Sequence, residues 1–229
     1  QQPWTITPHE GLDFGVQYWP TGKIGGDFYY IKELDESRTA FFIGDAVGKG
    51  LAAMLLMAYT FNILNQLISK DLSPQEVFIV TNNVLRKDLS DIGSFVTAFL
   101  AVWDRNIHVL TYCNSGHQPP ILMRKNFFKR TYLRTSGYFL GAFETGNYCQ
   151  SQVKLNEGDR ILFYTDGFLN IKDKEGRELK LSKLYQIILR NTHLPVKEVS
   201  GLLEREIEKY LEKAGSITDD MTFLLMEIK

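Results

Sequence analysis

The order in which strand-like and helix-like segments follow one another limits the folds open to this chain more than any other feature. Apolar runs typical of strands occur at 12–18, 27–32 and 39–44, and two helical segments follow them. A second block of strands precedes a second pair of helices, and an apolar strand segment at 221–228 ends the series. Strands and helices that come in blocks, rather than in strict alternation, favour an α+β fold with largely antiparallel sheets.

Local signals set the expected bounds of the remaining elements. The segment 51–68 is apolar nearly all round, as a buried helix would be. Ser73 and Pro74 are typical of the N-cap and first position of a helix that extends to about Leu89. Two more helices are predicted at 181–190 and 196–213, and four more strands at 95–103, 106–113, 120–124 and 159–164.

Composition excludes several classes of protein. The 229 residues are 44% hydrophobic and 23% charged, without a repeat or a Gly/Ser/Pro-rich linker, which predicts one domain over residues 1–229. The net charge of -1 gives no basic surplus for nucleic-acid binding. The longest apolar stretch, 51–64, is interrupted by polar residues and is too short to span a bilayer, so we expect no membrane contact by this domain.

The two cysteines and the first residue bear on the cellular setting. Cys113 and Cys149 lie far apart without metal-binding spacing, so we expect both to be reduced and mostly buried in a cytoplasmic protein. The sequence begins at Gln1 rather than Met, which predicts a piece of a longer chain. An upstream regulatory region is therefore expected, and through it the full-length chain could be tethered to a membrane.

Four acidic motifs share one pattern, an Asp next to Gly or Thr, and three of them lie at the start or end of a predicted strand. One such motif by itself indicates only a turn. Together they predict a cation site, because carboxylate and carbonyl oxygens suit Mg²⁺ or Mn²⁺ rather than zinc, and clustered carboxylates repel one another without a cation. Bridging carboxylates are typical of two-metal sites that activate water and stabilise phosphoryl transfer. The motifs are Gly25-Gly26-Asp27, Gly44-Asp45-Ala46, Thr165-Asp166-Gly167 and Thr218-Asp219-Asp220.

With one further motif, this set resembles the PPM family of metal-dependent phosphatases, in its bacterial SpoIIE/RsbU-like branch. The resemblance covers about residues 12–227, with the motifs in the family's order. The matching stretches are Gly25-Gly26-Asp27-Phe28-Tyr29, Gly44-Asp45-Ala46-Val47-Gly48-Lys49-Gly50, Asn114-Ser115-Gly116-His117-Gln118-Pro119-Pro120, Tyr164-Thr165-Asp166-Gly167 and Asp219-Asp220-Met221-Thr222.

The resemblance implies a PPM-type αββα sandwich, in which two stacked antiparallel sheets are flanked by helical layers. It implies four catalytic carboxylates around two Mn²⁺ or Mg²⁺ ions. Asp45 would bridge both ions together with the Ala46 carbonyl, Asp27 would serve one ion, and Asp166 and Asp219 the other. Asp220 is the alternative ligand to Asp219. A water bridging the metals would attack phosphorus directly.

The resemblance also implies a biological role. The expected activity is hydrolysis of phosphoserine or phosphothreonine in a protein, with an anti-sigma-factor antagonist of a partner-switching pathway as the expected substrate. An activator protein is a further expected partner, and a homodimer through the helices of 51–89 is compatible with the sequence. The alternatives are a non-catalytic domain that binds or senses, and a phosphatase for small molecules.

For three residues near the motifs, the sequence favours a structural or surface role over a catalytic one. His117 is expected to be a structural residue or one at the rim of the site, with a catalytic role as the alternative. No Arg stands out as a phosphate clamp. Lys23 and Lys49 are candidates for that role, although an exposed lysine is the simpler interpretation of each.

Overall fold

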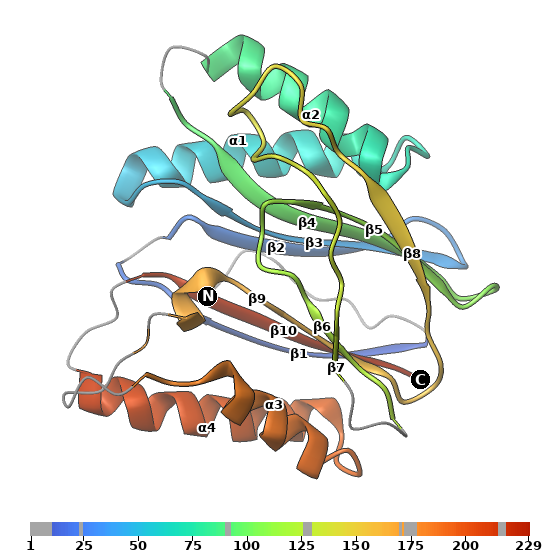
Figure 1. Cartoon of the computed structure of the whole chain (residues 1–229), viewed down its shortest axis with the longest axis vertical. Helices are drawn as coiled ribbons and strands as arrows, with labels where there is room; N and C mark the ends of the chain where they lie inside the picture. The colour runs from blue at the N-terminus through green and yellow to red at the C-terminus, as the bar shows by residue number, and fades with distance from the viewer. Residues whose placement is uncertain are drawn as a thin grey trace. The chain divides into compact units, whose positions relative to one another are not determined.

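The structure is a computed structural model that describes residues 11–22, 25–89, 93–125, 130–169, 171, 178–214 and 219–229. Within these residues it contains two five-stranded sheets, in which every strand pairs antiparallel to its neighbours. The chain divides into two compact units (Figure 1). Unit 1 comprises the described residues of 25–119 and 133–155, and unit 2 those of 11–22, 120–132 and 156–229.

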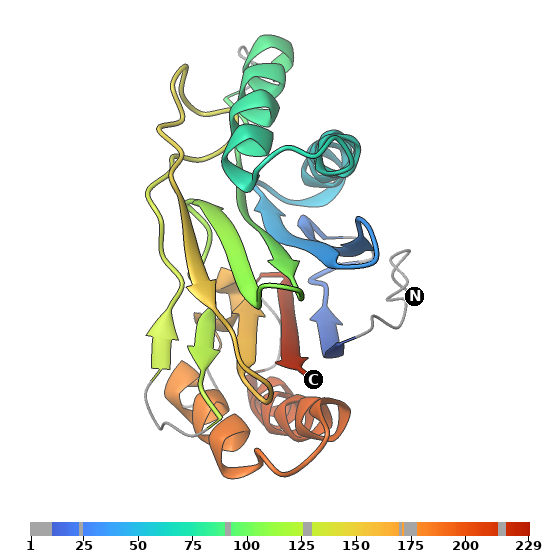
Figure 2. The same ribbon diagram turned by 90° about the vertical axis from the view of Figure 1, so that its right-hand side faces the viewer.

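Unit 1 is one sheet with a pair of helices on one of its faces, as Figures 1 and 2 show. Its strands follow the order β2-β3-β4-β5-β8. Helices α1 and α2 come directly after β3 in the chain. The bounds are β2 Asp27–Glu33, β3 Arg38–Ala46, α1 Gly50–Ile68, α2 Pro74–Leu89, β4 Val96–Asp104, β5 Val109–Ser115 and β8 Gln150–Lys154.

Alternation along the central strands of unit 1 decides which residues meet the helices. Phe28, Phe42 and Leu100 belong to the buried cluster that includes Leu64 of α1 and Phe78 of α2. A fully buried side chain of this size stabilises a fold by about 1.5–3 kcal/mol. Residues one position along point to the opposite face of the sheet. That opposite face carries the odd-numbered residues of β2, β3 and β4.

A capping box fixes the start of α2. The Ser73 hydroxyl accepts a hydrogen bond from the Glu76 amide (3.3 Å), while the Glu76 carboxylate accepts one from the Ser73 amide (2.8 Å). This reciprocal pair satisfies main-chain donors that the first helical turn leaves without partners. The predicted N-cap and first position of the helix are therefore confirmed.

Unit 2 pairs the other sheet, in the order β1-β10-β9-β6-β7, with helices α3 and α4. The apolar stripe of α4, which includes Val199, Leu203 and Ile207, is buried together with Phe223 and Leu225 of β10. The bounds are β1 Leu12–Trp19, β6 Ile121–Met123, β7 Arg130–Tyr132, β9 Arg160–Tyr164, the short 3-10 helix η2 Asp166–Leu169, α3 Leu181–Arg190, α4 Val196–Ala214 and β10 Met221–Ile228.

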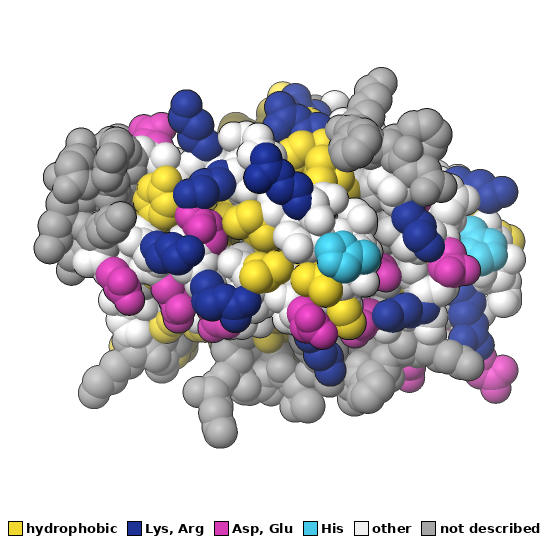
Figure 3. All heavy atoms as spheres, turned by 90° about the horizontal axis from the view of Figure 1, so that it is seen from below, with side chains coloured by type: hydrophobic (Ala, Val, Ile, Leu, Met, Phe, Trp, Pro, Cys, Tyr) yellow, Lys and Arg dark blue, Asp and Glu magenta, His cyan; other side chains and the backbone are white. Residues whose placement is uncertain are grey.

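The outer face of the α3–α4 pair is charged. Glu206 of α4 forms ion pairs with Lys183 of α3 and with Lys209 one turn along α4 (3.5 Å). Figure 3 shows acidic and basic side chains interspersed on this face, with hydrophobic side chains among them. Charges of both signs side by side are typical of a solvated surface.

Three short elements depart from the predictions. Strands β7 and β8 and helix η2 were not predicted. The residues of β8, Gln150–Lys154, alternate exposed with half-buried and form a mostly polar edge strand, which lacks the apolar pattern that identifies buried strands.

Two predictions about burial are wrong. Cys149 is exposed, whereas Cys113 is buried as expected, and both are free thiols. Helix α1 is not buried all round, because Leu51 and Leu55 are 68% and 59% exposed. By length and composition α1 is also long and apolar enough to cross a membrane, whereas segment 51–64 had been expected to be too short for that. Within the structure, 44% of the most apolar 18-residue stretch of α1 is buried. No other described helix passes that test.

Candidate metal centre

Asp27 and Asp45 lie directly opposite one another on β2 and β3 of unit 1. Side chains of directly opposed residues project from the same face of a sheet, with their Cβ atoms about 4.5–5.5 Å apart. This face is the one without helices, since the neighbouring Phe28 and Ala46 belong to the cluster under α1 and α2. Asp27 is only 3% exposed. Two carboxylates held side by side in this way repel one another, and a cation between them would relieve that repulsion.

Gly26 leaves room for the Ala46 carbonyl beside this pair. The Ala46 amide donates a hydrogen bond to the Gly26 carbonyl (3.2 Å), which brings the two main chains together. A Cβ atom on Gly26 would lie 2.8 Å from the Ala46 oxygen and 3.4 Å from Asp45 Oδ1. A side chain at position 26 would therefore crowd both the Ala46 carbonyl oxygen and the Asp45 carboxylate.

A second pair of carboxylates lies in unit 2, where β9 and β10 are antiparallel neighbours. Asp166 begins η2, separated from the end of β9 by Thr165, and Asp219 precedes β10. Thr165 and Thr222 join the two strand ends, because the Thr165 amide donates to the Thr222 carbonyl (3.0 Å) and the Thr222 amide donates to Thr165 Oγ1 (2.9 Å). Burial, and next the negative charge of Asp219, raise the pKa of the Asp166 carboxyl above its usual range.

Asp220, the alternative ligand, is engaged elsewhere in unit 2. Its Oδ1 accepts hydrogen bonds from the Thr21 amide (2.7 Å) and the Thr21 hydroxyl (2.9 Å). Its main chain also packs against Gly167, where a Cβ atom would lie 2.1 Å from the Asp220 carbonyl oxygen. These contacts give Asp220 a role in holding the loop, whereas the charge of Asp219 acts on Asp166.

The structure thus brings the predicted residues together as two pairs, Asp27 with Asp45 in unit 1 and Asp166 with Asp219 in unit 2. Among the described residues of either unit, no three His, Cys, Asp or Glu side chains gather as a metal-binding group. Lys49 is exposed at the N-cap position of α1, and Lys23 lies outside the described residues. His117 is 6% exposed and lies in unit 1, with its Nδ1 3.0 Å from Thr97 Oγ1.

Sequence comparison decides the family. The family model described as Stage II sporulation protein E (SpoIIE) matches residues 35–229. The chain belongs to the SpoIIE family. The resemblance inferred from the five motifs is therefore confirmed.

Two curated relatives of this SpoIIE-family chain are named phosphoserine phosphatases of Bacillus subtilis (strain 168). The phosphoserine phosphatase RsbU is 27% identical over 171 residues, which cover 75% of this chain and 50% of RsbU. The phosphoserine phosphatase RsbP is 24% identical over 217 residues, which cover 93% of this chain and 51% of RsbP. The chain therefore spans about half the length of these curated relatives.

Solved structures confirm the fold class. The SiaA-PP2C domain of Pseudomonas aeruginosa superposes with a TM-score of 0.81 at 19% identity, over 94% of this chain and 86% of that one. RsbX, solved in complex with magnesium, superposes with a TM-score of 0.74 at 18% identity, over 98% of this chain and 99% of that one. The SpoIIE-family chain therefore has the expected PPM-type α+β fold, with two antiparallel sheets and helical layers.

The residues of each pair fit divalent cations of the Mg²⁺ or Mn²⁺ kind. The donors are carboxylate oxygens and one main-chain carbonyl, which are the ligands these hard cations prefer. Because position 26 is a glycine, no side chain fills the space beside the Ala46 carbonyl oxygen and Asp45 Oδ1. Burial first, and the negative charge of Asp219 second, raise the pKa of the Asp166 carboxyl, and a cation would offset both effects.

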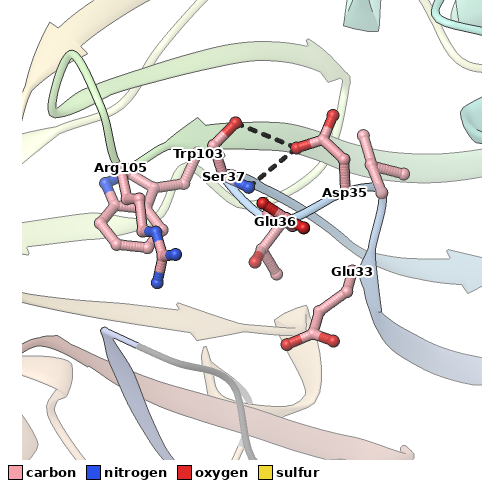
Figure 4. Close-up of a pocket in the computed structure, with 8 residues that line it drawn as sticks. Glu33, Asp35, Glu36, Ser37, Trp103 and Arg105 are labelled. Atoms are coloured by element: carbon pink, nitrogen blue, oxygen red, sulfur yellow. Dashed lines mark hydrogen bonds between the residues drawn. The ribbon is translucent and has the colours of Figure 1, made fainter.

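A cavity in unit 1 belongs to a different region of the sheet (Figure 4). Its volume is about 480 Å³, and it is lined by residues of the β2–β3 hairpin together with Trp103 and Arg105. The hairpin includes Asp35, whose Oδ1 accepts hydrogen bonds from the amides of Ser37 (2.9 Å) and Arg38 (2.8 Å). Glu33 and Asp27 are the opposite ends of β2, so this cavity is not the cation site.

Sequence reasoning missed Thr97 of unit 1 and Thr21 of unit 2. Thr97 lies opposite Asp45 only because of the strand register, and Thr21 meets Asp220 across 199 positions of sequence. No local signal in the sequence indicates either contact, because each joins positions far apart in the chain.

Proposed function

We propose that this chain is a metal-dependent phosphatase domain that hydrolyses phosphoserine or phosphothreonine in a protein. Membership of the SpoIIE family supports the proposal, as do relatives named phosphoserine phosphatases. The observation that carries it is the direct opposition of Asp27 and Asp45 on β2 and β3, beside the Ala46 carbonyl. Two negative charges held at that spacing, next to a carbonyl oxygen, are suited to hold a cation.

The roles proposed for the residues are those that the resemblance to the SpoIIE/RsbU branch implies. Asp27, Asp45 and the Ala46 carbonyl would hold Mn²⁺ or Mg²⁺ in unit 1, and Asp166 and Asp219 would hold it in unit 2. Such ions, when bound, acidify water and neutralise the charge of the transferring phosphoryl group. The carboxylates themselves supply oxygen ligands in fixed positions at the strand ends. The contacts of Asp220 with Thr21 support Asp219 as the ligand of the two.

The proposed substrate is a phosphorylated anti-sigma-factor antagonist in a partner-switching pathway. This choice of substrate rests on likeness to the SpoIIE/RsbU branch, and it is a more specific proposal than the phosphatase activity. Because the chain spans about half the length of RsbU and RsbP, we also propose that a regulatory region or an activator protein controls it. A cytoplasmic location and a homodimer stay predictions of the same kind.

The test is hydrolysis of p-nitrophenyl phosphate and of a phosphoserine protein, with Mn²⁺, with Mg²⁺ and with a chelator. We expect turnover that requires a cation and that falls at least about 100-fold in Asp45→Asn, since the change removes one charged ligand. Asp104→Asn is the matched control, because Asp104 lies at the far end of β4 and accepts a hydrogen bond that an Asn oxygen can also accept.

Two outcomes would contradict the proposal. Turnover that persists in chelator would exclude a cation mechanism. A folded wild type without turnover in either cation, even with an activator of a related system added, would favour a domain that only binds a partner.

A further inference from the structure

We propose that Thr97 and His117 are positioning residues for Asp45, with the His117 imidazole directing the Thr97 hydroxyl toward the Asp45 carboxylate. The inference rests on the proposed function, since it concerns how one carboxylate of the cation site is held. All of these residues lie in unit 1.

The strand register puts three polar side chains in one row. Asp27 on β2 is opposite Asp45 on β3, and Asp45 is in turn opposite Thr97 on β4. Directly opposed residues project from the same face, with Cβ atoms about 4.5–5.5 Å apart. The adjacent residues Ala46, Val96 and Ala98 belong to the cluster beneath the helices, so the row projects from the other face. Thr97 is therefore the neighbour of Asp45 on the side away from Asp27.

The imidazole of His117 extends this row by one hydrogen bond. Its Nδ1 lies 3.0 Å from Thr97 Oγ1. The segment before it returns to β4, where Gly116 forms an isolated bridge with Ala98, next to Thr97. Gly116 has φ of 68°, in the left-handed region that favours glycine, and a Cβ there would lie 2.3 Å from the Phe139 ring. The turn can therefore deliver His117 to Thr97 only with glycine at position 116.

The main chain of His117 is fixed by the Asn114 side chain. The His117 amide donates to Asn114 Oδ1 (2.8 Å), and Asn114 Nδ2 donates to the His117 carbonyl (3.0 Å). Asn114 is 4% exposed and His117 is 6% exposed, so both contacts are sheltered from water. The main chain that carries the imidazole is therefore held in place, and the contact of Nδ1 with Thr97 Oγ1 orients the ring.

Donor and acceptor chemistry then assigns the direction of the hydrogen bonds. An ionised carboxylate can only accept, so a hydroxyl beside Asp45 stabilises it only by donating its proton to it. The Thr97 hydroxyl can donate to Asp45 when it accepts from His117, which requires the proton on His117 Nδ1. In the opposite arrangement Thr97 would present lone pairs to the carboxylate. The geometry therefore points to the Nδ1-protonated tautomer, with the chain His117 to Thr97 to Asp45.

Such outer contacts orient metal ligands, and their loss typically weakens metal affinity by about 10–100-fold. The variants are Thr97→Val, which keeps the shape and removes the hydroxyl, and Thr97→Ser, which keeps the hydroxyl. Thr111→Val is the matched control, since it removes a hydroxyl that accepts a hydrogen bond from Gln152 (3.1 Å) on the same sheet. Apparent Mn²⁺ affinity is measured from the rise of the melting temperature with Mn²⁺ concentration.

We expect Thr97→Val to bind Mn²⁺ about 10–100-fold more weakly than the wild type, and Thr97→Ser and Thr111→Val to bind like the wild type. His117→Asn, whose amide can replace the Nδ1 donor, is expected to retain more affinity than His117→Leu. The ¹⁵N spectrum of the wild type, with the His117 signals identified by their loss in His117→Asn, reports the tautomer directly.

Two results would overturn the inference while leaving the proposed function intact. One is wild-type Mn²⁺ affinity in Thr97→Val, and the other is a His117 ring protonated on Nε2 alone. A wild type that binds neither Mn²⁺ nor Mg²⁺ overturns the proposed function, and the inference with it. The Thr97 variants keep the test decisive even if a change at the buried His117 prevents folding.

Discussion

Gly26 is the position where the smallest possible change should disturb the candidate cation site the most. In Gly26→Ala the new Cβ would lie 2.8 Å from the Ala46 carbonyl oxygen, 3.4 Å from Asp45 Oδ1 and 3.5 Å from the Ala53 Cβ. The first of these distances is about 0.6 Å short of the 3.4 Å at which ordinary van der Waals contact begins. The neighbouring atom is main chain, so it cannot move aside by a simple rotation.

The magnitude follows from that shortfall. Forcing one extra carbon into a packed region costs about 1–3 kcal/mol, and in a domain of this size each kcal/mol lowers the melting temperature by about 2–4 °C. The middle of that range predicts a fall of about 4–8 °C. Metal ligands must keep their distances within about 0.2 Å, so a shift of about 0.6 Å at Ala46 should cost at least about tenfold in Mn²⁺ affinity. Turnover should fall by about 100-fold.

The assay compares thermal unfolding, Mn²⁺ titration and turnover in Gly26→Ala and Gly201→Ala. Gly201 lies in α4, where the new Cβ would meet nothing nearer than Arg205 Nη1 at 3.7 Å. The control should therefore gain up to about 1 kcal/mol of stability from the better helix propensity of alanine. It should bind Mn²⁺ like the wild type.

The reasoning is refuted if Gly26→Ala has the melting temperature of the wild type and binds Mn²⁺ with wild-type affinity. That result would mean that the loop before β2 accommodates the carbon without moving Ala46. A loss of stability without any loss of Mn²⁺ affinity would separate the packing from the cation site, and would exclude the Ala46 carbonyl as a ligand.

Three further predictions test other parts of the molecule. Because the pKa of Asp166 is raised in the fold, the metal-free protein should lose stability as pH rises from the ordinary pKa of the carboxyl to its folded value. Asp166→Asn should therefore melt at a higher temperature than the wild type at neutral pH without metal, and should lose most of the rise in melting temperature that Mn²⁺ causes. A lower metal-free melting temperature in Asp166→Asn would contradict this prediction. Arg160 is 2% exposed, forms an ion pair with Glu227 and donates to three main-chain carbonyls between α3 and α4. Arg160→Met should therefore lower the free energy of unfolding, measured in urea, by about 3–5 kcal/mol. A loss below about 1 kcal/mol would show that water replaces these contacts. Cys149 is exposed, whereas Cys113 is buried and its burial raises the pKa of its thiol to about 12. A thiol reagent at pH 8 should therefore modify one cysteine per chain in the native protein and two in denaturant. Modification of both cysteines in the native protein would contradict the buried position of Cys113.

Most of the secondary structure could be predicted because it depends on local patterns. The predicted strand 27–32 and helix 51–68 are observed as Asp27–Glu33 and Gly50–Ile68, and α2 begins at Pro74 after the N-cap Ser73, as predicted. Strand β8 could not be predicted, because its polar residues are held by pairing with β5 rather than by an apolar pattern of their own. The environment of Cys149 likewise depends on where the chain before β8 lies.

The candidate site divides in the same way. The acidic motifs and their order identified the family that the comparison then confirmed, and they named every carboxylate of the two pairs. The assignment of those carboxylates to cations stays a prediction. The preference for Asp219 over Asp220 gained support only from the contacts of Asp220 with Thr21.

What the sequence determined by itself is the chemistry that is present: carboxylates beside glycines, apolar periodicity and a helix cap, each readable from residues close together in the chain. What only the tertiary structure decided is which of them meet. Asp45 faces Asp27 on one side and Thr97 on the other because β2, β3 and β4 pair in one register, and a shift by one residue would turn each side chain to the other face. The row from Asp27 to His117 is therefore a property of strand pairing between distant segments, which no local pattern encodes.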